Sequence, residues 1–449
     1  VGEEGVAADP GAADALRDEL DGPGLGGARV AGGEQRVGGE KLVGVLLRGP
    51  GGEQGVTREV GDDGEAAAAA ANPGSASPRY LSVDFYRGLT IAFMIIVNTP
   101  GAWETSFAPL RHAIWHGCTP TDLVFPSFMF IIGVSMWFSF AKYNRQWSPE
   151  AGRKILRRTA LIFLIGLLMN NFPFLWQNWD TWRVMGVLQR LALGYGLAAV
   201  LVLTLSHRAL IVVAAVLLLW YWGILNWFAS PGADPYGAQG SAILRLDSWL
   251  FGVKHLYRET VAPGLRIPFD PEGVLSTLPA IVTVLLGWFS GELMSRRSEQ
   301  KDLLIRDLLA CGVVLGFVGL AWDLAFPINK KIWSSSYVLY VGGISMVLLA
   351  LSIWVIDIRG WTRGTGFFLV FGANPLFAYV LSEALVITLS VITWGTGENE
   401  TDARTWIYDT VFKPVDGGAI SSFLFAICYM LLCWLVCREL YKRRIYIKI

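Results

Sequence analysis

Charged residues are scarce in this chain: they make up 16% of its 449 residues, whereas soluble domains carry about a quarter. This scarcity excludes an ordinary soluble domain, because 53% of the residues are hydrophobic. Lys plus Arg and Asp plus Glu number 37 each, so the formal net charge is zero. We therefore expect a protein whose partners include the lipid bilayer and do not include nucleic acid.

Residues 1–78 lack aromatic side chains altogether, and they hold 19 of the 50 glycines with 14 acidic against 6 basic residues. So few large apolar groups cannot offset the entropy of the chain, and the pattern of a signal peptide is absent. We predict a disordered, low-complexity tail over 1–78, followed by one transmembrane domain over 79–449. The chain opens with Val1 and its first methionine is Met94, so the assigned start could lie too far upstream.

Cysteine and histidine are also rare, with five and four residues. Three of the cysteines share the apolar stretch 418–437 without a histidine at metal-site spacing, so we expect neither disulfides nor a metal. His112 and His116 are four residues apart, but their segment is loop-like and no further histidine lies near. A metal there, or a nucleophilic pair of Cys118 with a histidine, is the weaker interpretation.

Long apolar stretches dominate the rest of the chain. A membrane span needs about 20 mostly apolar residues, and it must be helical because lipid offers no partners for backbone amides. We therefore predict an all-α, polytopic transmembrane helix bundle of about ten spans. The predicted spans are 84–100, 121–141, 155–172, 185–205, 209–228, 274–294, 304–325, 336–356, 367–392 and 418–437.

Basic residues are distributed unevenly between the two ends of these spans. Of the 31 in residues 79–449, 20 fall on the same side as the tail, many of them in the connection 142–158 and the C-terminal segment 438–448. Cytoplasmic connections carry this excess. We therefore expect a multi-pass membrane protein with both termini in the cytoplasm.

The connections on the other side are long and rich in tryptophan. They cover residues 101–120, 170–184, 229–273 and 393–417. Two interpretations stay open: an aromatic belt at the membrane interface, or a sugar-binding surface, because flat aromatic faces suit carbohydrate rings.

Ionisable and amide side chains inside spans are costly and mark cavities or partners. Asp84 and Arg87 are three residues apart and can pair on one helix face, or Arg87 can face a buried anion such as a phosphate. In the fourth span, Gln189 precedes Arg190, which must point into the bundle. Asn98 ends the first span, where its amide needs partners at membrane depth.

His112 precedes the motif Thr119-Pro120-Thr121-Asp122. Thr119 or Thr121 suits a helix N-cap and Asp122 suits the first turn, so capping alone could explain the motif. Histidine also titrates near neutral pH and passes protons. His112 is therefore a candidate base that a carboxylate such as Asp122 would orient.

In order along residues 80 to 385, these motifs resemble the catalytic region of the heparan-α-glucosaminide N-acetyltransferase family and its bacterial relatives. The matching residues are Ser82-Val83-Asp84, Arg87-Gly88, Asn98, His112-Ala113, Trp115, Gly117, Thr119, Asp122-Leu123-Val124-Phe125-Pro126, Gly186-Val187-Leu188-Gln189-Arg190, Asp270-Pro271-Glu272-Gly273, Asn329-Lys330, Trp333-Ser334, Ser336-Tyr337 and Asn374-Pro375.

The resemblance implies that residues 79–449 form a transmembrane acyltransferase domain of the bacterial inner membrane. It implies an enzyme that moves an acetyl group from cytosolic acetyl-CoA to an amino sugar, such as glucosamine, or to another glycan on the outer side of the membrane. It implies His112 as base or acyl carrier and Asn98 as a second catalytic residue, suited to donate to an oxyanion; Asp122 completes the catalytic set. Candidates for binding acetyl-CoA are Asp84, Arg87, Gln189, Arg190 and Lys330. Candidates for binding the acceptor are Trp115, His116, Asp270 and Glu272.

Two other functions stay open. A secondary transporter of a sugar or small anionic solute would also suit buried charges and spans broken by Pro126, Pro279 and Pro375, although no inverted repeat is apparent. A non-catalytic scaffold gives no reason for the polar residues in the spans. The sequence does not decide between N- and O-acetylation, between direct and two-step transfer, or whether the protein is a homodimer.

Overall fold

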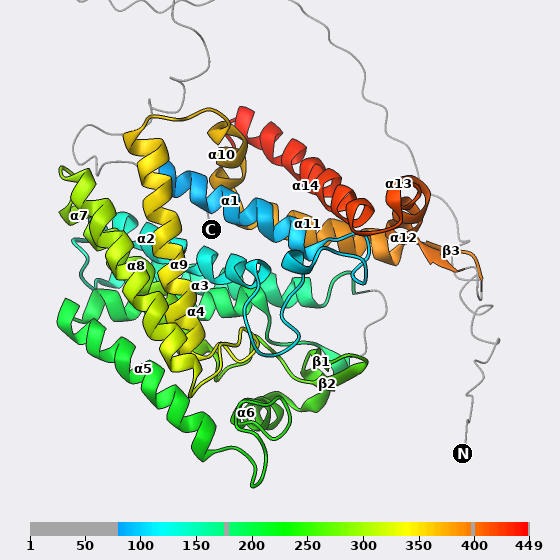
Figure 1. Ribbon diagram of the computed structural model, residues 1–449, viewed down its shortest axis with the longest axis horizontal. Coiled ribbons are helices and arrows are strands. Elements are labelled where there is room, and N and C mark those ends of the chain that lie inside the picture. Colours follow the sequence, from blue (N-terminus) through cyan, green and yellow to red (C-terminus); the bar gives the residue numbers. More distant parts are fainter. Residues whose placement is uncertain (1–79, 175–178, 397–399, 448–449) are drawn as a thin grey trace, which may run out of the picture. The chain divides into compact units, whose positions relative to one another are not determined.

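The computed structural model describes residues 80–174, 179–396 and 400–447 (Figure 1). The predicted tail over 1–78 lies outside these residues. Helices account for most of the described chain. The long helices are α1 (Leu81–Asn98), α2 (Val124–Ser139), α3 (Pro149–Asn170), α4 (Val187–Thr204), α5 (His207–Trp227), α7 (Thr277–Arg296), α8 (Lys301–Asp323), α9 (Ser335–Ser352), α10 (Thr365–Ala373), α11 (Pro375–Val391) and α14 (Ala419–Lys442).

Short elements occupy the long connections. They are α6 (Ala242–Phe251), α12 (Ala403–Ile407), α13 (Lys413–Asp416), and two antiparallel hairpins, β1 (Arg258–Ala262) with β2 (Leu265–Pro268) and β3 (Thr393–Trp394) with β4 (Thr401–Asp402). The hairpins are a small departure from the all-α prediction, and they lie outside the spans.

The predicted transmembrane helix bundle is confirmed. Within the described residues, eight helices are long and apolar enough to cross a membrane, and the bent pair α10–α11 makes a ninth if it counts as one span. The predicted span 155–172 corresponds to α3, which is not among them because its first ten residues carry four basic side chains. The count of ten spans and the cytoplasmic termini therefore stay predictions.

Glycines let several helices approach closely, as is common where helices pack in a membrane. A Cβ on Gly133 of α2 would lie 1.9 Å from the carbonyl oxygen of Val284 on α7, and a Cβ on Gly287 would lie equally close to that of Phe130. A Cβ on Gly88 of α1 would meet α10 in the same way. These contacts hold α2 against α7, and α1 against α10, at backbone distance.

A sharp bend of 84° separates α10 from α11. Asn374 occupies the bend and is fully buried, and Pro375 begins α11, where its missing N–H costs nothing. The side chain of Asn374 donates to the carbonyl oxygen of Ile445 at 2.9 Å and accepts from the backbone N–H of Ile447 at 2.7 Å. The segment that follows α14 is therefore pinned to the bend.

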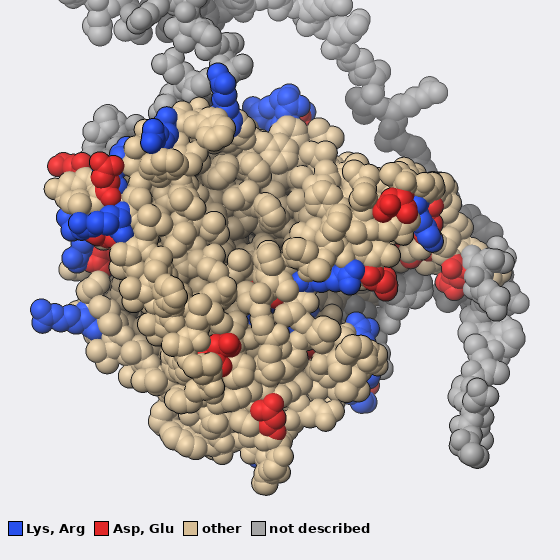
Figure 2. All heavy atoms as spheres, viewed as in Figure 1, with Lys and Arg blue, Asp and Glu red and all other residues tan. Residues whose placement is uncertain are grey.

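The bundle has two chemically different ends. The His112 end is where α1 finishes, where α2, α4, α7 and α9 begin, and where α6 and the β1–β2 hairpin lie. The basic end is where α1 and α8 begin and where α2, α7 and α14 finish. Lys and Arg gather there along the upper left edge of Figure 2, and a broad surface almost without charge follows.

Candidate active site

Asp122 is held by its own loop. Thr119 and Asp122 form a capping box at the start of the 3-10 turn η3 (Pro120–Leu123), which leads directly into α2 and confirms the predicted cap. Oδ2 of the carboxylate accepts from the backbone N–H groups of Ala113 at 3.1 Å and Thr119 at 3.0 Å. The side chain is 1% exposed, so these bonds fix it in one orientation.

His112 uses the remaining carboxylate oxygen. Its Nδ1 lies 2.6 Å from Oδ1 of Asp122. An ionised carboxylate only accepts hydrogen bonds, so Nδ1 carries the hydrogen and Nε2 is the basic nitrogen. The structure thus brings together the pair that the sequence suggested, in the geometry of a general base and its orienting acid.

Lys330 lies against the same imidazole. Its Nζ is 3.1 Å from Nδ1 and 3.4 Å from Nε2 of His112, and 3.7 Å from Oδ1 of Asp122. Burial lowers the pKa of His112 and the Lys330 ammonium lowers it further, whereas Asp122 opposes both effects. Burial likewise lowers the pKa of Lys330. The lowered pKa of His112 favours the neutral imidazole, which is the form that accepts a proton.

The loop that carries His112 and the loop that carries Lys330 are joined to each other by hydrogen bonds. The backbone N–H of Gly117 donates to the carbonyl oxygen of Ile328 at 2.7 Å, and Nδ2 of Asn329 donates to Nδ1 of His116 at 3.3 Å. Asn329 is fully buried, and its Oδ1 accepts from the N–H groups of residues 331 and 332. His116 therefore helps to hold the Lys330 loop rather than facing His112.

Cys118 does not make a reactive pair. Burial raises the pKa of its thiol to about 12, and Sγ lies 3.6 Å from the carbonyl oxygen of Thr119. A thiol that stays protonated near neutral pH is a poor nucleophile. Within the described residues, no group of three His, Cys, Asp or Glu side chains is placed to hold a metal.

Trp115 borders an open cavity of about 420 Å³ at the His112 end. The loop 233–239 and the β1–β2 hairpin form its other walls, with Asp234 and Gln239 among the lining residues. Nε1 of Trp115 donates to the carbonyl oxygen of Tyr236 at 3.0 Å, which fixes the ring. The cavity is large enough for one sugar ring, and it combines an aromatic side chain with polar groups.

Asp270 and Glu272 both bind Arg183. Nε and Nη2 of Arg183 reach the two oxygens of Asp270 at 3.0 and 2.8 Å, and Nη2 also reaches Oε2 of Glu272 at 2.9 Å. Asp270 is almost completely buried in this bidentate pair. It is therefore a structural partner of Arg183, and only Glu272 keeps part of its carboxylate accessible.

Gln189 and Arg190 begin α4, at the His112 end, and both are fully buried. Nη2 of Arg190 donates to the carbonyl oxygen of Gly273 and to Ser276, and its guanidinium lies 4.9 Å over the ring of Trp333. Nε and Nη1 of Arg190, and both amide atoms of Gln189, have no partner in the described part of the chain. Their donors are available to water or to a ligand.

Asp84 and Arg87 lie at the basic end, near the start of α1. They pair at 3.0 Å, as their spacing predicts, and Nη2 of Arg87 donates to Ser135 at 2.6 Å. The five candidates for acetyl-CoA thus divide into three groups: Asp84 with Arg87, Gln189 with Arg190, and Lys330 beside His112. The first two groups lie at opposite ends of the bundle.

Asn98 ends α1 at the His112 end, and its Nδ2 donates to Oε1 of Glu383 on α11 at 3.1 Å. A small void of about 10 Å³ lies between α1, α2, α4 and α11. Its lining is almost wholly apolar and includes Ile91, Met94 and Tyr379. Such a volume holds about one water molecule.

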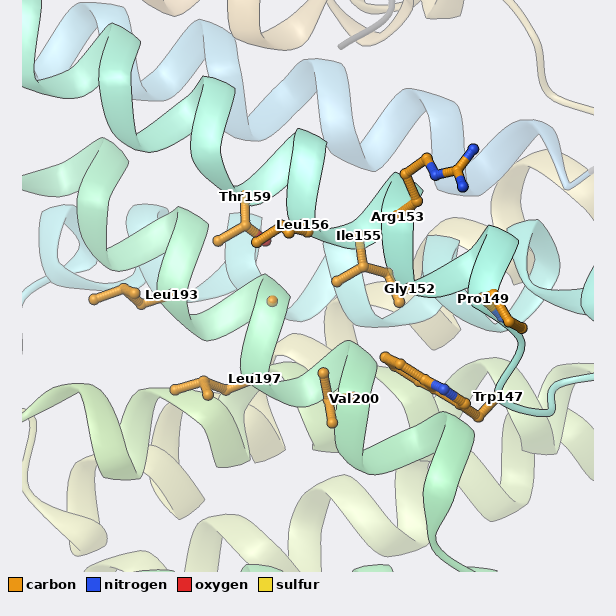
Figure 3. Close-up of a pocket in the computed structure, with 11 residues that line it drawn as sticks. Trp147, Pro149, Gly152, Arg153, Ile155, Leu156, Thr159, Leu193, Leu197 and Val200 are labelled. Atoms are coloured by element: carbon orange, nitrogen blue, oxygen red, sulfur yellow. The ribbon is translucent and has the colours of Figure 1, made fainter.

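A much larger cavity, of about 550 Å³, lies elsewhere (Figure 3). It is a groove between the start of α3 and the end of α4, at the basic end, and its walls are apolar side chains such as Trp147, Leu156 and Leu197. Among its lining residues only Arg153 and Thr159 carry polar side chains, and His112 is not one of them.

Comparison with known proteins decides the family. Residues 79–325 match the family model described as heparan-alpha-glucosaminide N-acetyltransferase, catalytic. The chain belongs to this family. It is 30% identical to the heparan-alpha-glucosaminide N-acetyltransferase of Homo sapiens over 355 residues, which are 68% of this chain and 53% of the human protein. The Mus musculus protein is 30% identical over 359 residues, covering 69% of this chain and 54% of the mouse protein.

The chain thus spans about half the length of these curated N-acetyltransferases. Two residues of the candidate site were missed by sequence reasoning. Arg183 lies in the connection 170–184, which was predicted to be on the outer side, where basic residues are less expected; that unusual position was the one sign of a role in the sequence. Glu383 is an acidic residue inside the apolar stretch 367–392, which is itself a reason to expect a role.

Proposed function

We propose that the protein transfers an acetyl group from cytosolic acetyl-CoA to the amine of an amino sugar or glycan on the other side of a membrane, in bacteria the inner membrane. The observation that carries this proposal is the His112–Asp122 pair at one end of a membrane-spanning bundle whose chain belongs to an N-acetyltransferase family. Asp122 fixes the tautomer, so Nε2 of His112 accepts the proton.

In the proposed reaction, the acetyl group passes from the thioester to the acceptor amine. The acceptor nitrogen attacks the thioester carbon, and Nε2 of His112 takes the proton that the nitrogen loses. The C–N bond forms and the C–S bond breaks, and the imidazolium returns its proton to the departing thiolate. Asn98 and the Lys330 ammonium supply donors for the charge that develops on the carbonyl oxygen, where a water-poor site makes such donors most effective.

We place the coenzyme phosphates at the basic end, near Arg87, because the donor is made in the cytosol and basic residues gather there. The thioester must then pass along α1 towards Asn98, which lies roughly 16 Å further along the helix at 1.5 Å per residue. Gln189 and Arg190 lie at the His112 end, so we assign them to the part of the donor that reacts and not to its phosphates. The acceptor is placed beside Trp115, His116 and Glu272.

The void between α1, α2, α4 and α11 supports this route, because it lies between the two ends and is apolar. At about 10 Å³ it is closed to a thioester arm. The helices around it must therefore separate during the reaction. The bent helix pair α10–α11 borders the void through Tyr379, and its bend gives it a natural point of movement.

The test is acetyl transfer by the full chain, purified in detergent, with labelled acetyl-CoA and glucosamine. The wild type should form N-acetylglucosamine, and His112→Ala should lose at least about 100-fold in kcat, the usual contribution of a positioned base. His207→Ala is the matched control, because His207 pairs with Glu292 at the basic end. Full activity of His112→Ala would remove this residue from the mechanism.

Transport is the second candidate, favoured by one observation: discontinuous helices such as α10–α11 form substrate sites in transporters. Reconstituted vesicles separate the two functions. Uptake of labelled glucosamine without any loss of label from acetyl-CoA would establish transport and overturn the transferase proposal.

A further inference from the structure

Glu383 is an acidic side chain near the middle of α11, a helix of the bent membrane pair. Carboxyl groups inside membrane segments are expensive and are retained mostly where they serve a site. Nothing in the mechanism above uses it. Its hydrogen-bond partner is Nδ2 of Asn98, at 3.1 Å, and the described part of the chain shows no other hydrogen bond to this carboxyl group.

The Asn98–Glu383 pair lies near the void, on the side of the His112 end. Met94 of α1 and Tyr379 of α11 both line the void. Asn98 is one helical turn beyond Met94, and Glu383 is one turn beyond Tyr379, so each lies on the same helix face as its lining residue. Both helices therefore continue from the void to the Asn98–Glu383 pair, which lies one helical turn beyond the void on each helix.

We propose that Glu383 is a positioning residue of the transfer reaction, which acts by holding the amide of Asn98. This inference rests on the acetyl transfer proposed above. A primary amide has two N–H donors and one acceptor oxygen. The carboxyl oxygen of Glu383 takes one N–H and fixes the plane of the amide, and the second N–H is then held in place for the carbonyl oxygen of the thioester.

An amide without this anchor can rotate about its side-chain bonds, and it then spends only part of its time in the donating orientation. Preorganisation of such a donor is what gives it catalytic value, and removal of one oxyanion donor typically costs about 100- to 1,000-fold in kcat. Loss of the anchor should cost less than loss of the donor itself.

The test compares variants of the full chain in the acetyl-transfer assay. We expect Glu383→Ala to lose about 10- to 100-fold in kcat, with little change in the KM for acetyl-CoA, because the donor is misplaced and not removed. Glu383→Gln keeps an acceptor oxygen at the same place and should retain activity within about threefold of the wild type. Thr388→Ala, an exposed position on the same helix, is the matched control.

A double-mutant cycle distinguishes an effect that acts through Asn98 from a purely structural effect of Glu383. If Glu383 acts through Asn98, Glu383→Ala should have no further effect in the Asn98→Ala background. Thermal unfolding of each variant shows whether it is folded, and the nearly isosteric Glu383→Gln keeps the test valid if Glu383→Ala does not fold.

Three results would overturn the inference: full activity of Glu383→Ala, activity of Glu383→Gln as low as that of Glu383→Ala, or losses that multiply in the double mutant. Each leaves wild-type transfer intact and so spares the proposed function. Absence of transfer by the wild type itself overturns both proposals.

Discussion

Asp122 accepts more hydrogen bonds than the capping of a helix requires. Two backbone N–H groups reach Oδ2, and His112 reaches Oδ1. We therefore expect Asp122→Asn to fold and yet to lose at least about 100-fold in kcat, because an amide can stabilise the wrong tautomer of the imidazole. Steady-state acetyl transfer measures the loss. Asp302→Asn, on the exposed first turn of α8, should stay near wild type.

Lys330 sets the pH range of the same imidazole. Catalysis needs neutral His112, so activity falls as the pH drops through the pKa of His112, which burial and Lys330 hold below its ordinary value of 6.5. Lys330→Met removes the cation and should move this acidic limb of the pH profile of kcat to higher pH. Lys330→Arg keeps the charge and should leave the limb near its place. An unshifted limb in Lys330→Met would show that Lys330 does not act on His112.

The sequence indicated His112 and Asp122 because a loop histidine stood just before an acid in a capping position. It could not place Lys330, more than 200 residues away, beside them, since that contact depends on how two loops are clamped in space. The ion pair of Asp270 was hidden from the sequence for the same reason. Its partner Arg183 comes from another connection, which no local pattern reveals.

The close contact of α2 with α7 at Gly133 leaves no room for a larger side chain. Gly133→Val places a branched side chain where the carbonyl oxygen of Val284 already lies, so α2 and α7 must separate. We expect a loss of about 1–3 kcal/mol in unfolding free energy, the usual cost of overpacking. A lower melting temperature in detergent measures it. Gly316→Ala adds a methyl group where no atom lies within 4 Å, and it should be neutral or stabilising.

Hydrophobic stretches predicted most elements, because a membrane allows little besides apolar helices. The exceptions have physical causes. The four basic residues in the first turns of α3 set it apart from the other spans, and Pro375 could signal a break without giving its angle. The short hairpins lie in polar connections, where pairing depends on neighbouring loops and not on a long local pattern.

At the scale of the whole molecule, the proposal requires that the two ends face different compartments. Glu299, between α7 and α8, is exposed at the basic end, and Gln239 is exposed at the His112 end. With Cys118 and the exposed Cys311 and Cys428 replaced by serine, a membrane-impermeant maleimide should label Gln239→Cys in right-side-out vesicles and Glu299→Cys only after permeabilisation. Equal labelling of both without permeabilisation would contradict the assigned orientation.

The buried side chain of Asn374 makes hydrogen bonds to the backbone of residues 445 and 447, and these bonds have a practical consequence for the production of this protein. A fluorescent reporter or affinity handle fused directly behind residue 449 would pull on the two hydrogen bonds that hold the α10–α11 corner. A flexible Gly/Ser linker between Ile447 and such a handle would spare these two hydrogen bonds.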